Sequence, residues 1–258
     1  MKIKYNDEFF YHSLKGSLSS AEIIIPILFE YINPRSILDI GCGYGDWLSV
    51  FEKRGIDDIL GIDGPWVNVQ FLKISNNKFL ASDLNILPAI NRKFDLLLSL
   101  EVAEHLNPKN SEDFIKYLIE ISPLILFSAA IPYQGGTNHI NEKWQSFWVS
   151  LFEKNGYIAF DIIRDKIWTN KKVEYWYAQN MFLFIDQNKL KDFKDLQKKF
   201  KSNENKIYDI VHPQNYIEKN QFFKNVENNI HLIPLKIIFK SFLYLPSSLI
   251  KKVKKKLK

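Results

Sequence analysis

Apolar positions in the first 186 residues fall into short runs separated by segments of helical period. Runs of strand length occupy residues 36–40, 58–62, 78–82, 94–100, 124–128, 157–163 and 181–185. Helical patterns occupy residues 17–32, 46–53, 111–121 and 141–154, whereas the aromatic stretch 168–180 fits neither period. This alternation predicts an α/β fold with a doubly wound, mostly parallel sheet, whose ligand sites lie at the carboxyl ends of the strands.

The pattern changes after Asp186, where Lys- and Asn-rich helical segments follow without a strand signal. We therefore predict one domain over residues 1–187 and a basic helical extension over residues 188–258. The total charge of +6 is the balance of −5 on residues 1–186 and +11 on residues 187–258. An acidic body suits a cationic or neutral small ligand, so the basic pI does not indicate a nucleic-acid enzyme.

Composition excludes several classes of protein. With 46% hydrophobic and 25% charged residues, the chain has the make-up of a globular protein. No apolar run reaches the length of a membrane span, and the charged start of the chain is unlike a signal peptide, so we expect a cytoplasmic location. The single cysteine, Cys42, excludes both an intrachain disulfide and a thiolate metal cluster, and no metal is predicted.

A glycine-rich loop, Gly-Cys-Gly-Tyr-Gly over residues 41–45, follows the first predicted strand and opens a helix. Glycines at such a turn let a ligand approach the backbone closely. A dinucleotide fingerprint would place its third glycine one residue later, and that position holds Asp46. A carboxylate there repels phosphate, so the loop favours a ligand without phosphate.

Three more acids end successive predicted strands, namely Asp39, Asp63 and Asp83. Each alone would fit a strand-end cap, but together they form an acidic row along one sheet edge. S-adenosylmethionine matches this row through its sulfonium, ammonium, ribose diol and adenine amine. Asp63, 22 residues after Gly41, is placed for the ribose, and Asp83 with Leu84 for the adenine amine.

On these residues the chain resembles the class I, seven-stranded Rossmann-like methyltransferases that use S-adenosylmethionine. The resemblance covers roughly residues 36–186, and its most specific part is Leu-Asp-Ile-Gly-Cys-Gly-Tyr-Gly over residues 38–45. It implies S-adenosylmethionine as cofactor and S-adenosylhomocysteine as product. We treat Cys42 as a packing residue without chemistry of its own. The predicted cofactor contacts are Asp39, Gly41, Cys42, Gly43, Asp63, Gly64, Asp83, Leu84 and Glu101.

The segment Glu-Val-Ala-Glu-His-Leu over residues 101–106 leaves the fourth predicted strand, beside the expected position of the transferred methyl group. If this segment is helical, Glu101 and His105 share one face, and the carboxylate orients an imidazole that takes a proton from the acceptor. We predict Glu101, His105 and His139 as catalytic candidates. The alternative for His105 is a turn cap, or closure over the cofactor without acid–base work.

A second polar and aromatic segment over residues 133–144 follows the fifth predicted strand and contains two adjacent glycines. Together with the aromatic stretch 175–180, it resembles methyltransferases of bacterial capsule and lipopolysaccharide sugar pathways. Side chains of this type hydrogen-bond to and stack on sugar rings, and a loop there can exclude water. The alternative is a surface loop that caps the next helix. The predicted acceptor contacts are Tyr133, Thr137, Asn138, His139, Asn141, Trp144, Tyr177 and Asn180.

Residues 234–258 hold eight lysines, no acid and interleaved apolar residues. Such a segment suits peripheral contact with an anionic membrane, here on its inner face, or it packs on the domain or on a second subunit in a homo-oligomer. No nucleic-acid partner is expected.

The leading functional hypothesis is O-methylation of a sugar or sugar nucleotide that becomes part of a capsular or other surface polysaccharide. One alternative is methylation of an amine, a carboxylate or a phosphorus-containing group, which the same fold permits. The other is a cofactor-binding scaffold of a glycan pathway without catalysis. The glycine loop with its three acids favours an enzyme, because a scaffold has no need of them.

Overall fold

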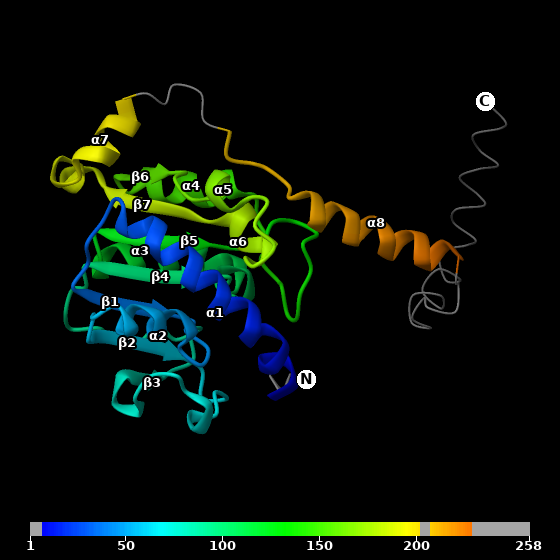
Figure 1. The fold of residues 1–258 in the computed structure, drawn as a ribbon, viewed down its shortest axis with the longest axis horizontal. Coiled ribbons are helices and arrows are strands. Elements are labelled where there is room, and N and C mark those ends of the chain that lie inside the picture. Colours follow the sequence, from blue (N-terminus) through cyan, green and yellow to red (C-terminus); the bar gives the residue numbers. More distant parts are fainter. Residues whose placement is uncertain (1–6, 202–206, 229–258) are drawn as a thin grey trace. The chain divides into compact units, whose positions relative to one another are not determined.

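The structure is a computed structural model that describes residues 7–201 and 207–228. Its centre is a seven-stranded sheet with the order β3-β2-β1-β4-β5-β7-β6, in which only β7 runs antiparallel to its neighbours (Figure 1). This confirms the predicted α/β fold with a mostly parallel sheet. The strands are β1 (Ser36–Ile40), β2 (Asp58–Asp63), β3 (Phe79–Ala81), β4 (Leu96–Leu100), β5 (Leu124–Ser128), β6 (Tyr157–Phe160) and β7 (Phe182–Asp186).

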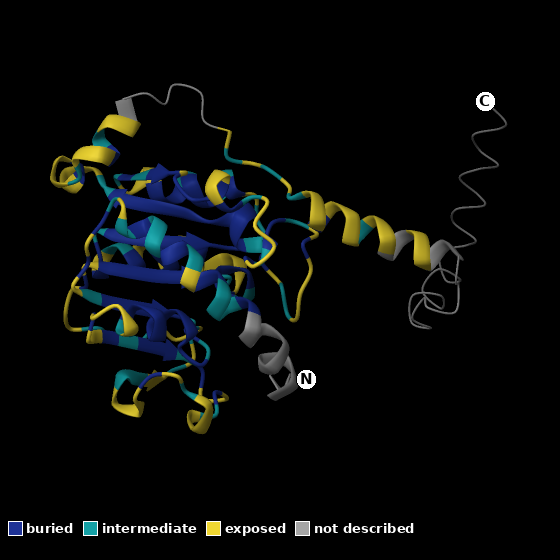
Figure 2. Ribbon diagram, in the orientation of Figure 1, coloured by how far each residue is buried: buried dark blue, intermediate teal, exposed yellow. Residues whose placement is uncertain are grey.

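Helices cover both faces of the sheet and enclose two apolar cores. α1, α2, α5 and α6 contribute to one core, whereas α3 and α4 contribute to the other. The central strands are dark blue in Figure 2, since β4 and β5 are buried over their whole length. The helices are α1 (Asp7–Phe29), α2 (Asp46–Lys53), α3 (Ser111–Ile121), α4 (Gln145–Lys154), α5 (Arg164–Ile167), α6 (Tyr175–Asn180), α7 (Lys194–Lys201) and α8 (Pro213–Asn228).

The sheet order places a ligand crevice beside β1. The chain passes from β1 outward to β2 and β3 on one side, and β4 and β5 continue on the other. At this switch point the loops after β1 and β4 diverge, which opens a crevice at the carboxyl ends of the strands. The predicted glycine loop and the segment 101–106 both begin here.

Helix α1 begins ten residues before the predicted start at residue 17. The predicted helix began directly after Gly16, a residue type that lowers helix propensity. In the structure a Cβ at Gly16 would overlap the carboxylate of Glu174, so the glycine permits close packing of α1 beside the chain that leads into α6. Packing therefore outweighs propensity at this position.

The chain divides into two compact units, residues 1–212 and Pro213–Lys258. The first extends past the predicted boundary at residue 187, because residues 207–212 bond to the sheet domain. The buried guanidinium of Arg164 donates to the carbonyl of Tyr208 (2.8 Å), and Gln145 Nε2 donates to the carbonyl of Ile210 (2.9 Å). The second unit contains α8, and the basic segment 234–258 lies outside the described residues. Within the described ranges no helix is long and apolar enough to cross a bilayer.

Candidate active site

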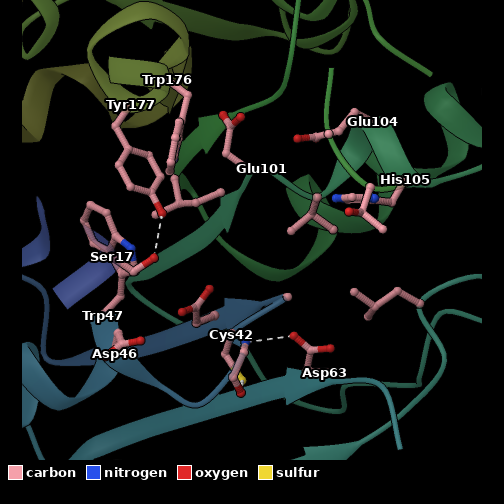
Figure 3. Close-up of a pocket in the computed structure, with 18 of the residues that line it drawn as sticks. Ser17, Cys42, Asp46, Trp47, Asp63, Glu101, Glu104, His105, Trp176 and Tyr177 are labelled. Atoms are coloured by element: carbon pink, nitrogen blue, oxygen red, sulfur yellow. Dashed lines mark hydrogen bonds between the residues drawn. The ribbon is translucent and has the colours of Figure 1, made fainter. Parts of the chain in front are cut away.

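A cavity of about 350 Å³ opens at the switch point of the sheet. Segments distant in sequence form its wall: the glycine loop, the ends of β2 and β4, the loop after β5, helix α6 and Ser17 of α1. Figure 3 shows labelled side chains from the glycine loop, the ends of β2 and β4, α6 and α1 around one space. The sequence-predicted cofactor and acceptor segments therefore share a single cavity.

The glycine loop has the backbone that the sequence predicts. Gly41 and Gly43 have φ angles of 83° and 54°, which residues with side chains rarely adopt. A Cβ at Gly41 would overlap a methyl group of Val102, whereas Gly43 has open space beside it. The loop thus fits tightly against the β4 side and leaves room for a ligand at Gly43.

Asp63 holds this loop in place. Its carboxylate accepts from the amides of Gly43 (2.8 Å) and Gly64 (2.6 Å). Burial raises the pKa of Asp63, while these amides and the Trp66 side chain act in the opposite direction. A carboxylate offers about four acceptor positions, so about one remains for a ribose hydroxyl after the two backbone bonds and the bond from the Trp66 side chain.

The other acids make the cavity wall rich in carboxyl groups, whose neutral forms burial favours and whose ionised forms a cationic ligand would favour. Asp39 is buried, and its pKa is raised well above the usual range by burial and then by the charges of Asp63 and Asp46. Asp46 forms an ion pair with Lys73. Five carboxylates line the cavity, and among its described lining residues none is lysine or arginine. Such a wall favours a cationic ligand.

Cys42 lies in the loop as a packing residue. Its thiol is buried, and burial followed by the charges of Asp39 and Asp63 raises its pKa well above the usual value. A thiol held protonated is a poor nucleophile. This supports the prediction that Cys42 has no chemistry of its own.

Of the two residues predicted to contact adenine, only one lies in the cavity wall. Leu84 lines the cavity, but the exposed Asp83 is absent from the described wall. Asp83 instead accepts from the amide and the side chain of Asn85, each at 2.9 Å. Gly64 also lies off the wall and contributes through its bond to Asp63. A contact from Asp83 to adenine stays a prediction.

Glu101 and His105 do not share a helical face, because the segment lacks the helix from Glu101 onward that this arrangement required. Glu101 has a left-handed φ of 55°, and only Ala103–His105 forms a short 3-10 helix. The Glu101 carboxylate accepts from Gln134 Nε2 (3.0 Å) and Asn180 Nδ2 (3.2 Å). Burial raises its pKa to about 7 despite these bonds. Glu101 is therefore oriented by amides and not by an imidazole.

His105 instead lies against His139, the other predicted base. The ring centroids are 4.8 Å apart and nearly perpendicular. Burial and then the charge of His139 lower the pKa of His105 to about 4, so His105 is neutral at physiological pH. Nδ1 of His139 lies 3.0 Å from a carboxylate oxygen of Glu142. The fold thus joins two histidines that are separated in sequence.

Glu142 also holds the loop after β5. Its carboxylate accepts from the amides of Tyr133 (2.7 Å) and Gly135 (2.7 Å), in addition to its contact with His139. Thr137 and His139 of this loop line the cavity, as does Tyr177 of α6. These three are the predicted acceptor residues that the structure brings to the cavity wall.

The remaining predicted acceptor residues have other positions. Tyr133 and Trp144 are exposed and lie off the described wall, as does the partly buried Asn138. The amide of Asn141 is buried and donates to the carbonyl of Ala103 (3.1 Å), so Asn141 fastens the loop. Asn180 is buried and orients Glu101. Direct contact of these residues with an acceptor stays a prediction.

Sequence reasoning missed several residues of the wall. Ser17, Trp47 and Trp176 line the cavity, and the Ser17 hydroxyl bonds to the Tyr177 hydroxyl at 3.2 Å across 160 residues of sequence (Figure 3). Gln134 lines it as well and holds Glu101. The sequence pattern around these residues indicates only that they lie in helices or loops. It carries no signal that they converge on one cavity.

Comparison with known proteins agrees with this geometry. A family model described as a methyltransferase domain matches residues 20–181, which include strands β1 to β6 and every cavity-lining residue except Ser17. The chain belongs to this methyltransferase family. No curated protein matches the methyltransferase.

Several solved structures are similar to the methyltransferase, and one of them, a complex with SAH, supports its fold. It is the plantazolicin methyltransferase BpumL in complex with a monoazolic desmethylPZN analog and SAH, at 16% identity and a TM-score of 0.50, covering 69% of this chain and 88% of that one. Another is the methyltransferase domain of bacterial CtHen1-CN, at 17% identity and a TM-score of 0.48, covering 66% of this chain and 99% of that one.

The cofactor of the methyltransferase is S-adenosylmethionine. The cavity fits it on three observations: open space at Gly43, a wall rich in carboxyl groups, and the half-buried carboxylate of Asp63 at the end of β2. Gly43 and Asp63 would hold the ribose side, and Asp39 would face the cationic side.

Proposed function

We propose that this methyltransferase O-methylates a hydroxyl group of a sugar or sugar nucleotide that becomes part of a capsular or other surface polysaccharide. The observation that carries the proposal is the set of five carboxyl groups in the cavity wall. Five carboxylates without a described lysine or arginine disfavour an anionic acceptor group, either carboxylate or phosphorus-containing. A neutral hydroxyl meets no such repulsion.

The acceptor side of the cavity carries uncharged polar and aromatic groups. Thr137, Gln134, Tyr177 and Trp176 line it, and such side chains hydrogen-bond to hydroxyls and cover the faces of sugar rings. The diphosphate of a sugar nucleotide would lie outside the acidic wall. This arrangement supports a sugar acceptor held by its ring and hydroxyls.

The chain's own residues have two tasks in the reaction. S-adenosylmethionine would supply a methyl group that is bonded to sulfur. An electron pair of the acceptor oxygen would form the new bond to the methyl carbon, and the electron pair of the broken bond would remain on sulfur. Around it, the residues must align the acceptor and take up the hydroxyl proton. Glu101, His105 and His139 are the candidates for the proton, because all three line the cavity.

A panel of acceptors tests the proposal. With labelled S-adenosylmethionine, we expect transfer to sugar nucleotides and none to matched substrates whose only acceptor is a carboxylate or phosphonate. The label should appear as an alkali-stable methyl ether. Transfer to an amine alone, or to an anionic group, would contradict O-methylation of a sugar.

The basic segment 234–258 supports a second, separate proposal of peripheral membrane contact. Removing residues 234–258 should abolish salt-sensitive binding to anionic vesicles, because about 1 kcal/mol per lysine is lost. Turnover on a soluble acceptor should stay nearly unchanged, since the described cavity wall ends at Tyr177. Vesicle flotation measures the first effect. Vesicle binding that survives the truncation would refute membrane contact through this segment.

A further inference from the structure

We propose that Glu104, His105 and His139 form a binding site for one divalent first-row transition-metal cation in the cavity wall. One ligand atom from each residue lies within 4.8 Å of the others. All three residues line the cavity described above. The inference deepens the proposed function and rests on it for the identity of the acceptor, whereas cation binding itself is independent of that identity.

The carboxylate of Glu104 is the first observation that points to a cation. Glu104 is fully buried, and neither carboxylate oxygen has a hydrogen-bond partner of good geometry among the described residues, although the backbone amides of Glu104 and Ala130 lie near enough to favour its charged form. Glu101 and Glu142 are close enough for their charges to oppose that of Glu104. A buried carboxylate is costly unless a counter-charge or hydrogen bonds compensate it. A bound cation would supply that compensation, as Lys73 does for Asp46.

The arrangement of the histidines is the second observation. The contact of Nδ1 of His139 with Glu142 at 3.0 Å is the carboxylate–histidine pairing that orients metal-ligating imidazoles. Gly136 is required beside this ring, because a Cβ there would overlap the imidazole of His139. The rings of His105 and His139 are nearly perpendicular, and each has a nitrogen within 4.8 Å of a carboxylate oxygen of Glu104.

The donor set selects the type of cation. Two imidazole nitrogens and one carboxylate oxygen suit Mn²⁺, Fe²⁺, Co²⁺ or Zn²⁺, whereas Mg²⁺ and Ca²⁺ prefer oxygen ligands alone. Metal–ligand bonds of about 2.0–2.2 Å place two ligands of one ion no more than about 4.4 Å apart. A modest side-chain rotation would therefore close the site. The sequence-based exclusion of metal considered thiolate clusters and overlooked this mixed set.

Three protein ligands leave open coordination positions on the cavity side. An acceptor hydroxyl bound there would have a lowered pKa, because the cation stabilises the alkoxide. The hydroxyl proton would pass to Glu101 or to water, and the oxygen would keep the electron pair that forms the bond to the methyl carbon. His105 and His139 would then act as ligands instead of bases.

Cobalt titration of the full-length protein tests the site. After treatment with EDTA and its removal, the parent should bind one Co²⁺ per chain by calorimetry, and the complex should absorb in the visible range. Glu104→Gln and His139→Asn should each weaken binding by at least tenfold, and Glu142→Gln by about 10- to 100-fold through the orientation of His139. His212→Asn is the matched control, because His212 contacts Trp168 and Tyr175 away from this cluster.

Several outcomes would overturn the proposal. The parent could bind no Co²⁺, or the variants could bind Co²⁺ as tightly as the parent does. Displacement of Co²⁺ by an equal concentration of Mg²⁺ would also contradict the proposal. If the Glu104→Gln protein fails to fold, Co²⁺ should still raise the melting temperature of the parent and not that of folded His139→Asn.

Activity separates this inference from the proposed function. EDTA-treated parent should lose methyl transfer to a sugar nucleotide and regain it with Mn²⁺ or Co²⁺, while S-adenosylmethionine binding stays unchanged by calorimetry. Full turnover without metal would refute a role of the cation in the reaction and leave sugar methylation standing. Stoichiometric Co²⁺ binding without sugar methylation would support the site and contradict the acceptor.

Discussion

Replacing Asp63 by alanine is expected to weaken binding of S-adenosylmethionine by about 100-fold or more. Hydrogen bonds to a charged group contribute about 1.5–3 kcal/mol each, and about 1.4 kcal/mol corresponds to a factor of ten. The variant would lose the bond of its carboxylate to the ribose and release the amides of Gly43 and Gly64, so that the loop beside the cofactor loses its support. Calorimetry with the purified protein measures the change.

The control is Asp58→Ala, which removes an exposed carboxylate from the opposite end of the same strand, β2. This variant should bind the cofactor as the parent does. Asp83→Ala, studied beside it, decides whether Asp83 reaches adenine. Unchanged affinity in Asp63→Ala would mean that the ribose lies elsewhere in the cavity.

Replacing His105 or His139 by alanine should reduce turnover by about 10²–10⁴-fold with cofactor affinity intact. This range is typical for loss of a proton-transfer group, and loss of a metal ligand also lowers turnover. Both rings line the cavity and lie against one another. Single-turnover kinetics with saturating cofactor would measure the chemical step.

His212→Ala is the matched control, since it removes a partly buried histidine outside the cavity wall. It should retain parental turnover. If turnover falls less than tenfold in both His105→Ala and His139→Ala, neither histidine transfers the proton. This part of the wall would then accelerate the reaction only by aligning the acceptor. The metal dependence of the parent separates a histidine base from a histidine ligand.

Elements with a buried core and clear boundaries were predictable from sequence. β1 matches residue for residue, because its apolar run lies between Pro34 and Gly41. Helix α3 and strand β5 match in the same way. In contrast, α4 begins at Gln145 and not at residue 141, because the side chain of Asn141 is used to fasten the loop to Ala103.

The cofactor side of the site was more accessible to sequence reasoning than the acceptor side. Residues such as Asp39 and Asp63 end strands, and parallel strands bring their carboxyl ends together, so their convergence follows from topology. The placement of Glu104 depends on the backbone after β4. The left-handed φ of Glu101 turns this segment out of helical period, so a four-residue spacing to His105 was the wrong guide.

The bond between Ser17 and Tyr177 has a consequence for synthesis of the protein. These two residues of the cavity wall lie 160 positions apart, so the pocket is closed by a contact between early and late parts of the chain. Contacts of such long range form late in folding, since their loop-closure entropy must first be offset. A nascent chain still lacking α6 would have its glycine loop but an open pocket. Stabilisation by cofactor would therefore begin only after residue 180 has left the ribosome.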